Sequence, residues 1–256
     1  MGMFKQDLTF STPYMNAAGT LGFAPDYRAP VPWDEFGAFV TNPISLRPRK
    51  PTKNPALIEY PGGFLLHTGL PNPGLRAVIK KYARRWADSQ LPIIVCLMAD
   101  IPEETAHMVQ FLEEIENIVG VELGYPPLLP DDFILSTVEM CLGEMPIIVS
   151  LPGEQVLSLG PRVMQAGAAA ISLGVQRGMI VMENGQQVTG RLNGPGLFPG
   201  ALLTVRDAAQ ANIPIIGAGG VGSKENADAM LSVGALAVQG DTSLWKGDVS
   251  VWAPTP

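Results

Sequence analysis

The chain has 256 residues, of which 46% are hydrophobic and 16% are charged, and its formal net charge is −7. This length suits one large α/β domain, and we expect residues 1–256 to form a single domain. The acidic charge argues against nucleic acid or an anionic membrane surface as the main partner. The start of the chain lacks the apolar core of a signal peptide, and no apolar run reaches the ~18 residues that span a bilayer. We therefore expect a cytoplasmic protein.

Few residues are available for metal binding or thiol chemistry. Cys96 and Cys141 each lie in apolar sequence, which favours buried free thiols over a disulfide. The only histidines are His67 and His107, and they lie in separate segments. We expect no histidine-based metal cluster or catalytic triad, and no metal site.

Short apolar runs alternate with helical patterns along the chain. At the N-terminus, Phe4, Leu8 and Phe10 alternate with polar residues, which predicts a short antiparallel hairpin. Eight predicted strands then end near Ala17, Thr41, Met98, Leu123, Leu151, Leu173, Ala218 and Gln239. Predicted helices cover residues 75–87, 102–118, 131–142, 154–165 and 201–211, and a last one starts near 223.

Two long connections interrupt this alternation. Residues 45–72 are rich in proline and glycine around short apolar pieces, which predicts an excursion shaped as a β-hairpin lid. Residues 174–200 are expected to form a long loop. Both connections lead back into a regular strand–helix pattern.

Eight strand–helix units predict an α/β fold, a (β/α)8 barrel with an N-terminal hairpin and a lid-like insertion after the second strand. An open doubly wound sheet is the alternative, because the first two units are irregular. The last two predicted strands end in glycine turns, at residues 217–220 and 240–242. Together these turns form what we call the phosphate cradle, because glycine lets backbone N–H groups approach an anion closely.

Several segments, in a shared order, resemble the dihydroorotate dehydrogenase family of FMN-binding barrels. Residues 15–20 (MNAAGT) are similar to the family's MNASGT, and residues 37–41 (GAFVT) resemble its second strand. Residues 61–63 (PGG) and 69–74 (GLPNPG) resemble its substrate-covering hairpin. Asn193-Gly194-Pro195 and the segments IPIIGAGG and AVQGDT resemble its later turns. The resemblance extends over nearly the whole chain and implies the barrel fold and an FMN site.

The resemblance also assigns residues to that FMN site. Ala18 and Gly19 would lie beside the flavin ring, and the phosphate would be held by Gly194, Gly219, Gly220, Gly240 and Thr242. The two family lysines that face the flavin N1–C2 edge are here Asn42 and Ser150. Both can donate hydrogen bonds, but neither can neutralise the negative charge of a reduced flavin.

The catalytic residues of the family are not found at the matching positions. The family base is a Cys or Ser in the loop after the fourth strand, and this loop begins Gly124-Tyr125-Pro126 here. Tyr125, with an ordinary pKa of about 10, is a poor base at neutral pH, and we expect it to pack as an aromatic. The substrate-holding asparagines align with Leu66 and with Leu173 or Gly174. The catalytic residues are therefore unknown, and dihydroorotate is not the expected substrate.

Three charged residues bear on ligand binding. Asp241 lies inside the phosphate cradle, and a carboxylate ~5 Å from a phosphate would cost ~3 kcal/mol per unit charge at an effective dielectric of about 20. An outward-pointing Asp241 would cost far less, and the sequence leaves both directions open. Arg191 has two interpretations, a contact with an acidic ligand or a solvated loop position. Glu122 is expected to be a buried structural carboxylate.

Two functions follow from these observations. The first is a divergent FMN-dependent oxidoreductase that acts on an unidentified substrate. The alternative is a catalytically inactive barrel that serves as a ligand-binding or regulatory subunit. Both imply a small-molecule ligand. Family resemblance favours a homodimer, whose interface could include apolar residues near the C-terminus, such as Val249, Val251 and Trp252.

Overall fold

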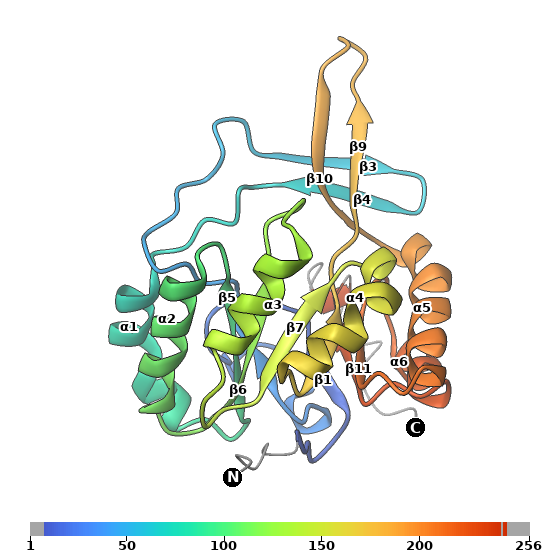
Figure 1. Cartoon of the computed structure of the whole chain (residues 1–256). Coiled ribbons are helices and arrows are strands. Elements are labelled where there is room, and N and C mark those ends of the chain that lie inside the picture. Colours follow the sequence, from blue (N-terminus) through green and yellow to red (C-terminus); the bar gives the residue numbers. More distant parts are fainter. Residues whose placement is uncertain (1–7, 242, 245–256) are drawn as a thin grey trace.

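The computed structural model describes residues 8–241 and 243–244, and it is built around a parallel eight-stranded sheet. The strand order is β1-β12-β11-β8-β7-β6-β5-β2, and a parallel bridge between Met15 and Ala38 connects β2 back to β1. Helices surround this ring on the outside (Figure 1). The predicted (β/α)8 barrel is therefore confirmed, and the open doubly wound sheet is not formed.

The barrel elements follow the predicted order. Its strands are β1 (Tyr14–Asn16), β2 (Phe39–Val40), β5 (Ile93–Met98), β6 (Ile118–Gly124), β7 (Ile147–Leu151), β8 (Ala170–Leu173), β11 (Ile215–Gly217) and β12 (Ala237–Gly240). The helices are α1 (Leu75–Ala87), α2 (Pro102–Glu113), α3 (Asp131–Met140), α4 (Gly153–Ala166), α5 (Phe198–Gln210) and α6 (Lys224–Ser232), with 3-10 turns η1 (Trp33–Glu35) and η2 (Pro195–Leu197). Every predicted strand corresponds to one of these barrel strands.

The strands read as continuous apolar runs because both of their faces are buried. In β5, Ile94 and Cys96 belong to the cluster inside the barrel, whereas Val95 and Leu97 belong to the larger cluster between strands and helices. Leu8 and Phe10 pack against the inner cluster. Residues 8–13 form no strand, so this part of the expected N-terminal hairpin is wrong, and Phe4 lies outside the described residues.

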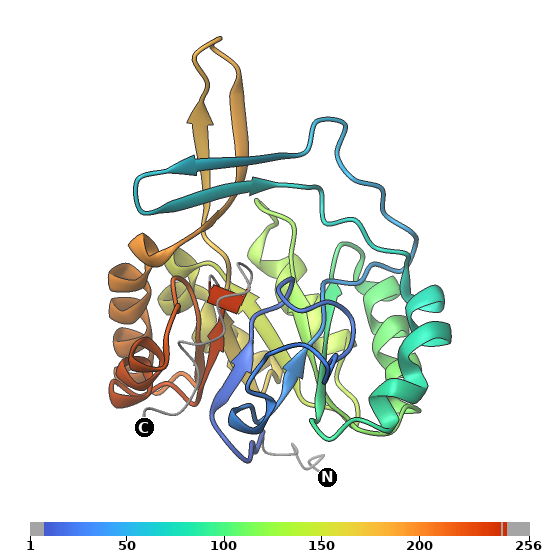
Figure 2. The same ribbon diagram turned by 180° about the vertical axis from the view of Figure 1, so that it is seen from behind.

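A second sheet covers one end of the barrel. The predicted lid hairpin is present as β3 (Ala56–Tyr60) and β4 (Gly63–His67). The loop expected at residues 174–200 is wrong, because it contains the hairpin β9 (Arg177–Val181) and β10 (Gln187–Asn193). Strand β10 pairs with β4, so the order is β3-β4-β10-β9, and Figure 2 shows this sheet above the barrel.

Helix α2 ends at Glu113, earlier than the predicted end at residue 118. Asn117 has a φ of 64°, a left-handed conformation that a helix cannot contain. Its side-chain amide donates hydrogen bonds to the carbonyl groups of Trp86, Ser89 and Leu91. These bonds fix the turn before β6, and Ile118 already belongs to that strand.

Three further predictions concern the cysteines, membrane-spanning helices and the dimer interface. Cys96 and Cys141 are free and buried, as predicted. Within the described ranges, no helix has both the length and the apolar character that a membrane span requires. Val249, Val251 and Trp252 lie outside the described residues, so the dimer interface stays a prediction.

Candidate functional site

The predicted site residues lie where barrel strands end, on the side that we call the barrel mouth. Ala18 and Gly19 follow β1, Asn42 follows β2, and Ser150 lies near the end of β7. Gly219 and Gly220 follow β11 and Gly240 ends β12, which are neighbouring strands of the barrel, whereas Gly194 follows β10 of the lid sheet. Thr242 lies outside the described residues.

The glycines of the predicted cradle adopt conformations that other residues rarely take. Gly219 and Gly220 have φ angles of +97° and +72°. A Cβ atom on Gly220 would lie 2.6 Å from the backbone nitrogen of Phe198 and 2.8 Å from the carbonyl oxygen of Gly194. The turn after β11 therefore packs closely on the segment after β10, which holds its backbone in place.

Gly194 has a φ angle of +136° and is also restricted by the lid. A Cβ atom there would lie 2.4 Å from the carbonyl oxygen of Gly62, in the turn of the lid hairpin. Close packing against the lid thus explains why a glycine stands at position 194, and it does so just as well as phosphate binding would. Its role in holding a ligand stays a prediction.

Asp241 points into the cradle, which decides between the two directions that the sequence leaves open. Its Oδ2 atom accepts a hydrogen bond from the Gly220 N–H at a donor–acceptor distance of 3.2 Å. Its own N–H donates to the carbonyl oxygen of Val221 at 3.2 Å. The turn after β11 therefore already binds an anionic oxygen, and that oxygen belongs to the chain itself.

This arrangement does not fit the phosphate of FMN. A phosphate in the cradle would meet the negative charge of Asp241 at the N–H group of Gly220 that is expected to bind it. Near the ring position, the Asn42 side-chain oxygen accepts a hydrogen bond from the Gly22 N–H at 3.2 Å, so it is committed to the loop after β1. Neither Asn42 nor Ser150 supplies a cation to this region.

A cation does reach the mouth, but from the lid. The Nη1 atom of Arg191 in β10 lies 3.6 Å from the position of a Cβ atom on Gly19, and Pro43 is also beside it. Burial lowers the pKa of Arg191, the nearby Arg177 lowers it further, and Cys96 opposes this shift. The guanidinium nevertheless stays charged at any physiological pH. The described residues place no carboxylate in an ion pair with Arg191.

Below the mouth, a buried polar pair crosses the inside of the barrel. Glu122 in β6 is 3% exposed, and the Gln239 amide donates a hydrogen bond to its Oε2 atom at 2.6 Å. Burial raises the pKa of Glu122, and the hydrogen bond from Gln239 partly offsets that increase. The predicted burial of Glu122 is thus confirmed, and its structural role stays a prediction.

Among the residues that the structure describes, the loop after β6 carries no group that matches the family's catalytic base. The loop between β6 and α3 spans residues 125–130, and Tyr125 is its only side chain with a hydroxyl. Tyr125 packs against the main core, and burial raises its pKa above the ordinary value, so it is not a base. Leu66 and Leu173 are 8% and 7% exposed, and their apolar side chains cannot donate hydrogen bonds to a substrate.

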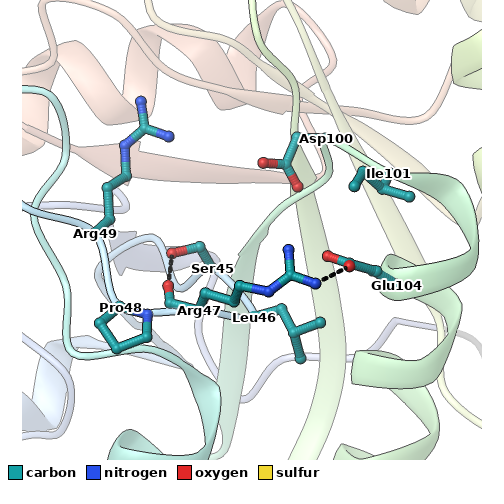
Figure 3. A pocket seen from close by; sticks show the side chains of 8 residues that line it. All are labelled: Ser45, Leu46, Arg47, Pro48, Arg49, Asp100, Ile101 and Glu104. Atoms are coloured by element: carbon teal, nitrogen blue, oxygen red, sulfur yellow. Dashed lines mark hydrogen bonds and ion pairs between the residues drawn. The ribbon is translucent and has the colours of Figure 1, made fainter.

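A cavity of about 160 Å³ lies beside the mouth, between the segment after β2 and the start of α2. Its lining contains two cations and two acids. Arg47 and Glu104 form an ion pair at 2.7 Å, which Figure 3 marks with a dashed line. None of the predicted site residues lines it. Among the described residues, no cluster of three or more His, Cys, Asp or Glu side chains could hold a metal ion.

Comparison with known proteins supports the resemblance. The family model for dihydroorotate dehydrogenase matches residues 5–128. The catalytic subunit of dihydroorotate dehydrogenase B (NAD(+)) from Pelobacter propionicus is 32% identical over 257 residues, covering 92% of this chain and 84% of the relative. The corresponding subunits from Trichlorobacter lovleyi and Pyrococcus abyssi are 30% and 28% identical, covering 92% and 96% of this chain and 84% and 88% of the relatives. The chain therefore belongs to the dihydroorotate dehydrogenase family.

Proposed function

We propose that the barrel mouth binds a small anionic ligand under the lid, and that this chain does not oxidise dihydroorotate. The observation that carries the proposal is the half-buried Arg191 guanidinium beside Gly19. A desolvated cation without an anionic partner is costly, so a bound anion would stabilise it. The proposal develops the ligand-binding alternative that the sequence left open.

The lid strands strengthen the argument for an anion. Arg191 lies directly opposite Arg177 in the register between β10 and β9. Like charges at opposed positions of an antiparallel pair destabilise the pair. A carboxylate near both residues would remove this repulsion, and guanidinium groups bind carboxylates with two parallel hydrogen bonds.

Within the described part of the chain, the loop after β6 offers no suitable base, and this supports the second half of the proposal. Oxidation of dihydroorotate requires a base, and Tyr125 is packed in the core with a raised pKa. Orotate would also need hydrogen-bond donors where this chain has Leu66 and Leu173. Leaving several polar atoms of a buried ligand unpaired costs about 1–3 kcal/mol for each atom.

The experiment is calorimetric titration with malonate, citrate and orotate as anionic probes, and with uracil as a neutral probe. We expect at least one anionic probe to bind, and Arg191→Leu to weaken that binding at least about 10-fold. Arg84→Leu is the matched control, because Arg84 is an exposed arginine of α1 outside the lid, and its loss should leave the affinity unchanged. Failure of every anion to bind, or equal affinity of the Arg191→Leu variant, would contradict the proposal.

An FMN-dependent oxidoreductase with another substrate is the second candidate. It is favoured by the glycine turns at the ends of β11 and β12, and FMN is the cofactor that membership of this family suggests. An absorbance scan of freshly purified protein across the visible flavin bands tests it. Yellow protein with stoichiometric flavin would favour this candidate over a barrel without redox chemistry.

We further propose that the chain forms a homodimer, for which the family resemblance is the support. Light scattering coupled to size-exclusion chromatography gives the mass in solution. A monomeric mass across a tenfold range of concentration would be evidence against the dimer.

A further inference from the structure

We propose that Asp241 is an internal substitute for a phosphate group, and that it excludes FMN and other phosphorylated ligands from the cradle. This inference does not depend on the ligand proposed for Arg191. It starts from the hydrogen bond that the Gly220 N–H donates to the Asp241 carboxylate at 3.2 Å. The cradle then selects against phosphate, although its glycines have the conformations that suit it.

The position of Asp241 in the fold keeps its carboxylate at the Gly220 N–H. Asp241 directly follows β12, which pairs with β11 on one side and with β1 on the other. Its own N–H donates to the carbonyl oxygen of Val221, so backbone and side chain both contact the turn after β11. A carboxylate tethered in this way has a high effective concentration at the N–H, and a free phosphate has to displace it.

The turn itself has little freedom to move away. Val221 is fully buried, and a Cβ atom on Gly220 would contact the backbone of Phe198 and of Gly194. A phosphate would therefore have to enter while the turn and Asp241 keep their places. Its charge would then lie near a carboxylate that already holds one of the N–H groups.

The expected loss of phosphate affinity is estimated from the repulsion between the two negative charges alone. Two unit negative charges ~5 Å apart, at an effective dielectric of about 20, correspond to a weakening of affinity by about 100-fold. Removing the charge should recover most of this factor. Removing the whole side chain should also free the Gly220 N–H for the incoming phosphate.

The test is fluorescence titration of the full chain with FMN and, in parallel, with riboflavin, which lacks the phosphate. We expect Asp241→Ala to tighten FMN binding about 100-fold over the unaltered chain. Asp241→Asn should give a smaller gain, because its amide oxygen can still accept from Gly220. Riboflavin affinity should stay unchanged in both variants.

Glu225→Gln is the matched control, because Glu225 is an exposed carboxylate in the first turn of α6, shortly after the same glycine turn. It removes the same charge without vacating the cradle and should leave FMN affinity unchanged. Circular dichroism checks that each variant is folded, and Asp241→Asn carries the test if Asp241→Ala is not. Equal FMN affinity in the unaltered chain and both Asp241 variants would overturn the proposal, as would an equal gain for riboflavin.

Discussion

The two sides of the barrel mouth differ in what the family pattern requires of them. On the side of β11 and β12, the pattern requires backbone conformations, and Gly219 and Gly220 adopt them. On the side of β2, β6 and β7, it requires particular side chains, and Asn42, Tyr125 and Ser150 stand there without a cation or a base. The backbone conformations are thus retained at Gly219 and Gly220, whereas the side chains at positions 42, 125 and 150 supply neither a cation nor a base.

This difference shows why a retained glycine pattern does not by itself establish a cofactor. Glycines hold a turn open through sterics, and the same turn can serve a phosphate, a carboxylate or only the packing of a lid. The charge of one neighbouring side chain, Asp241, decides which of these occurs. A site made of backbone can therefore change its ligand without changing its shape.

The largest expected change in stability comes from the glycine turn after β11. Gly220→Ala places a Cβ atom 2.6 Å from the nitrogen of Phe198 at a φ of +72°. We expect a loss of about 3 kcal/mol in the free energy of unfolding, measured by urea denaturation. Gly200→Ala in α5 is the control, since its Cβ would meet nothing within 4 Å. It should stabilise the protein by about 0.5–1 kcal/mol. Equal effects of the two changes would show that the turn is not closely packed.

A somewhat smaller effect is expected inside the barrel. Glu122→Ala removes the acceptor of the Gln239 amide and leaves a small cavity. We expect a loss of about 2 kcal/mol by urea denaturation. Glu122→Gln keeps the size and one acceptor, so it should cost less. A loss as large in Glu122→Gln as in Glu122→Ala would indicate that the charge itself matters.

The same carboxyl predicts a pH dependence of stability. Burial raises the pKa of Glu122, so the folded chain keeps a proton that the unfolded chain has already released. Stability is therefore highest below the ordinary glutamate pKa, and it falls as the pH rises from that value through the raised pKa. Glu122→Gln should lack this decline in a comparison of urea midpoints across the acidic and neutral range. An identical decline in the variant would assign it to other groups.

The smallest expected change in stability tests the β2 side of the mouth, where the family pattern requires particular side chains. Asn42→Lys restores the cation of the family pattern but removes the acceptor of the Gly22 N–H. We expect a loss of about 1 kcal/mol in unfolding free energy and no gain in FMN affinity while Asp241 is present. A clear gain in FMN affinity from Asn42→Lys alone would mean that the ring side limits binding, and not the cradle.

The sequence by itself determined the barrel, because strand and helix patterns are local and repeat in a regular order. It also determined that the loop after β6 carries no base, since the residue types there can be read directly. Asn117 shows the limit of local patterns, because its bonds to Trp86, Ser89 and Leu91 hold a turn where the pattern predicted helix. Local periodicity alone cannot show such a contact.

Only the tertiary structure decided which side chains lie at the barrel mouth and in which direction they point. The pairing of β10 with β4 brings together strands far apart in sequence, and this pairing places Arg191 beside Gly19. The direction of Asp241 depends on Gly220, which lies in the turn after the neighbouring barrel strand. Both are contacts between distant segments, and side-chain direction at such contacts follows from packing and charge that no short stretch of sequence contains.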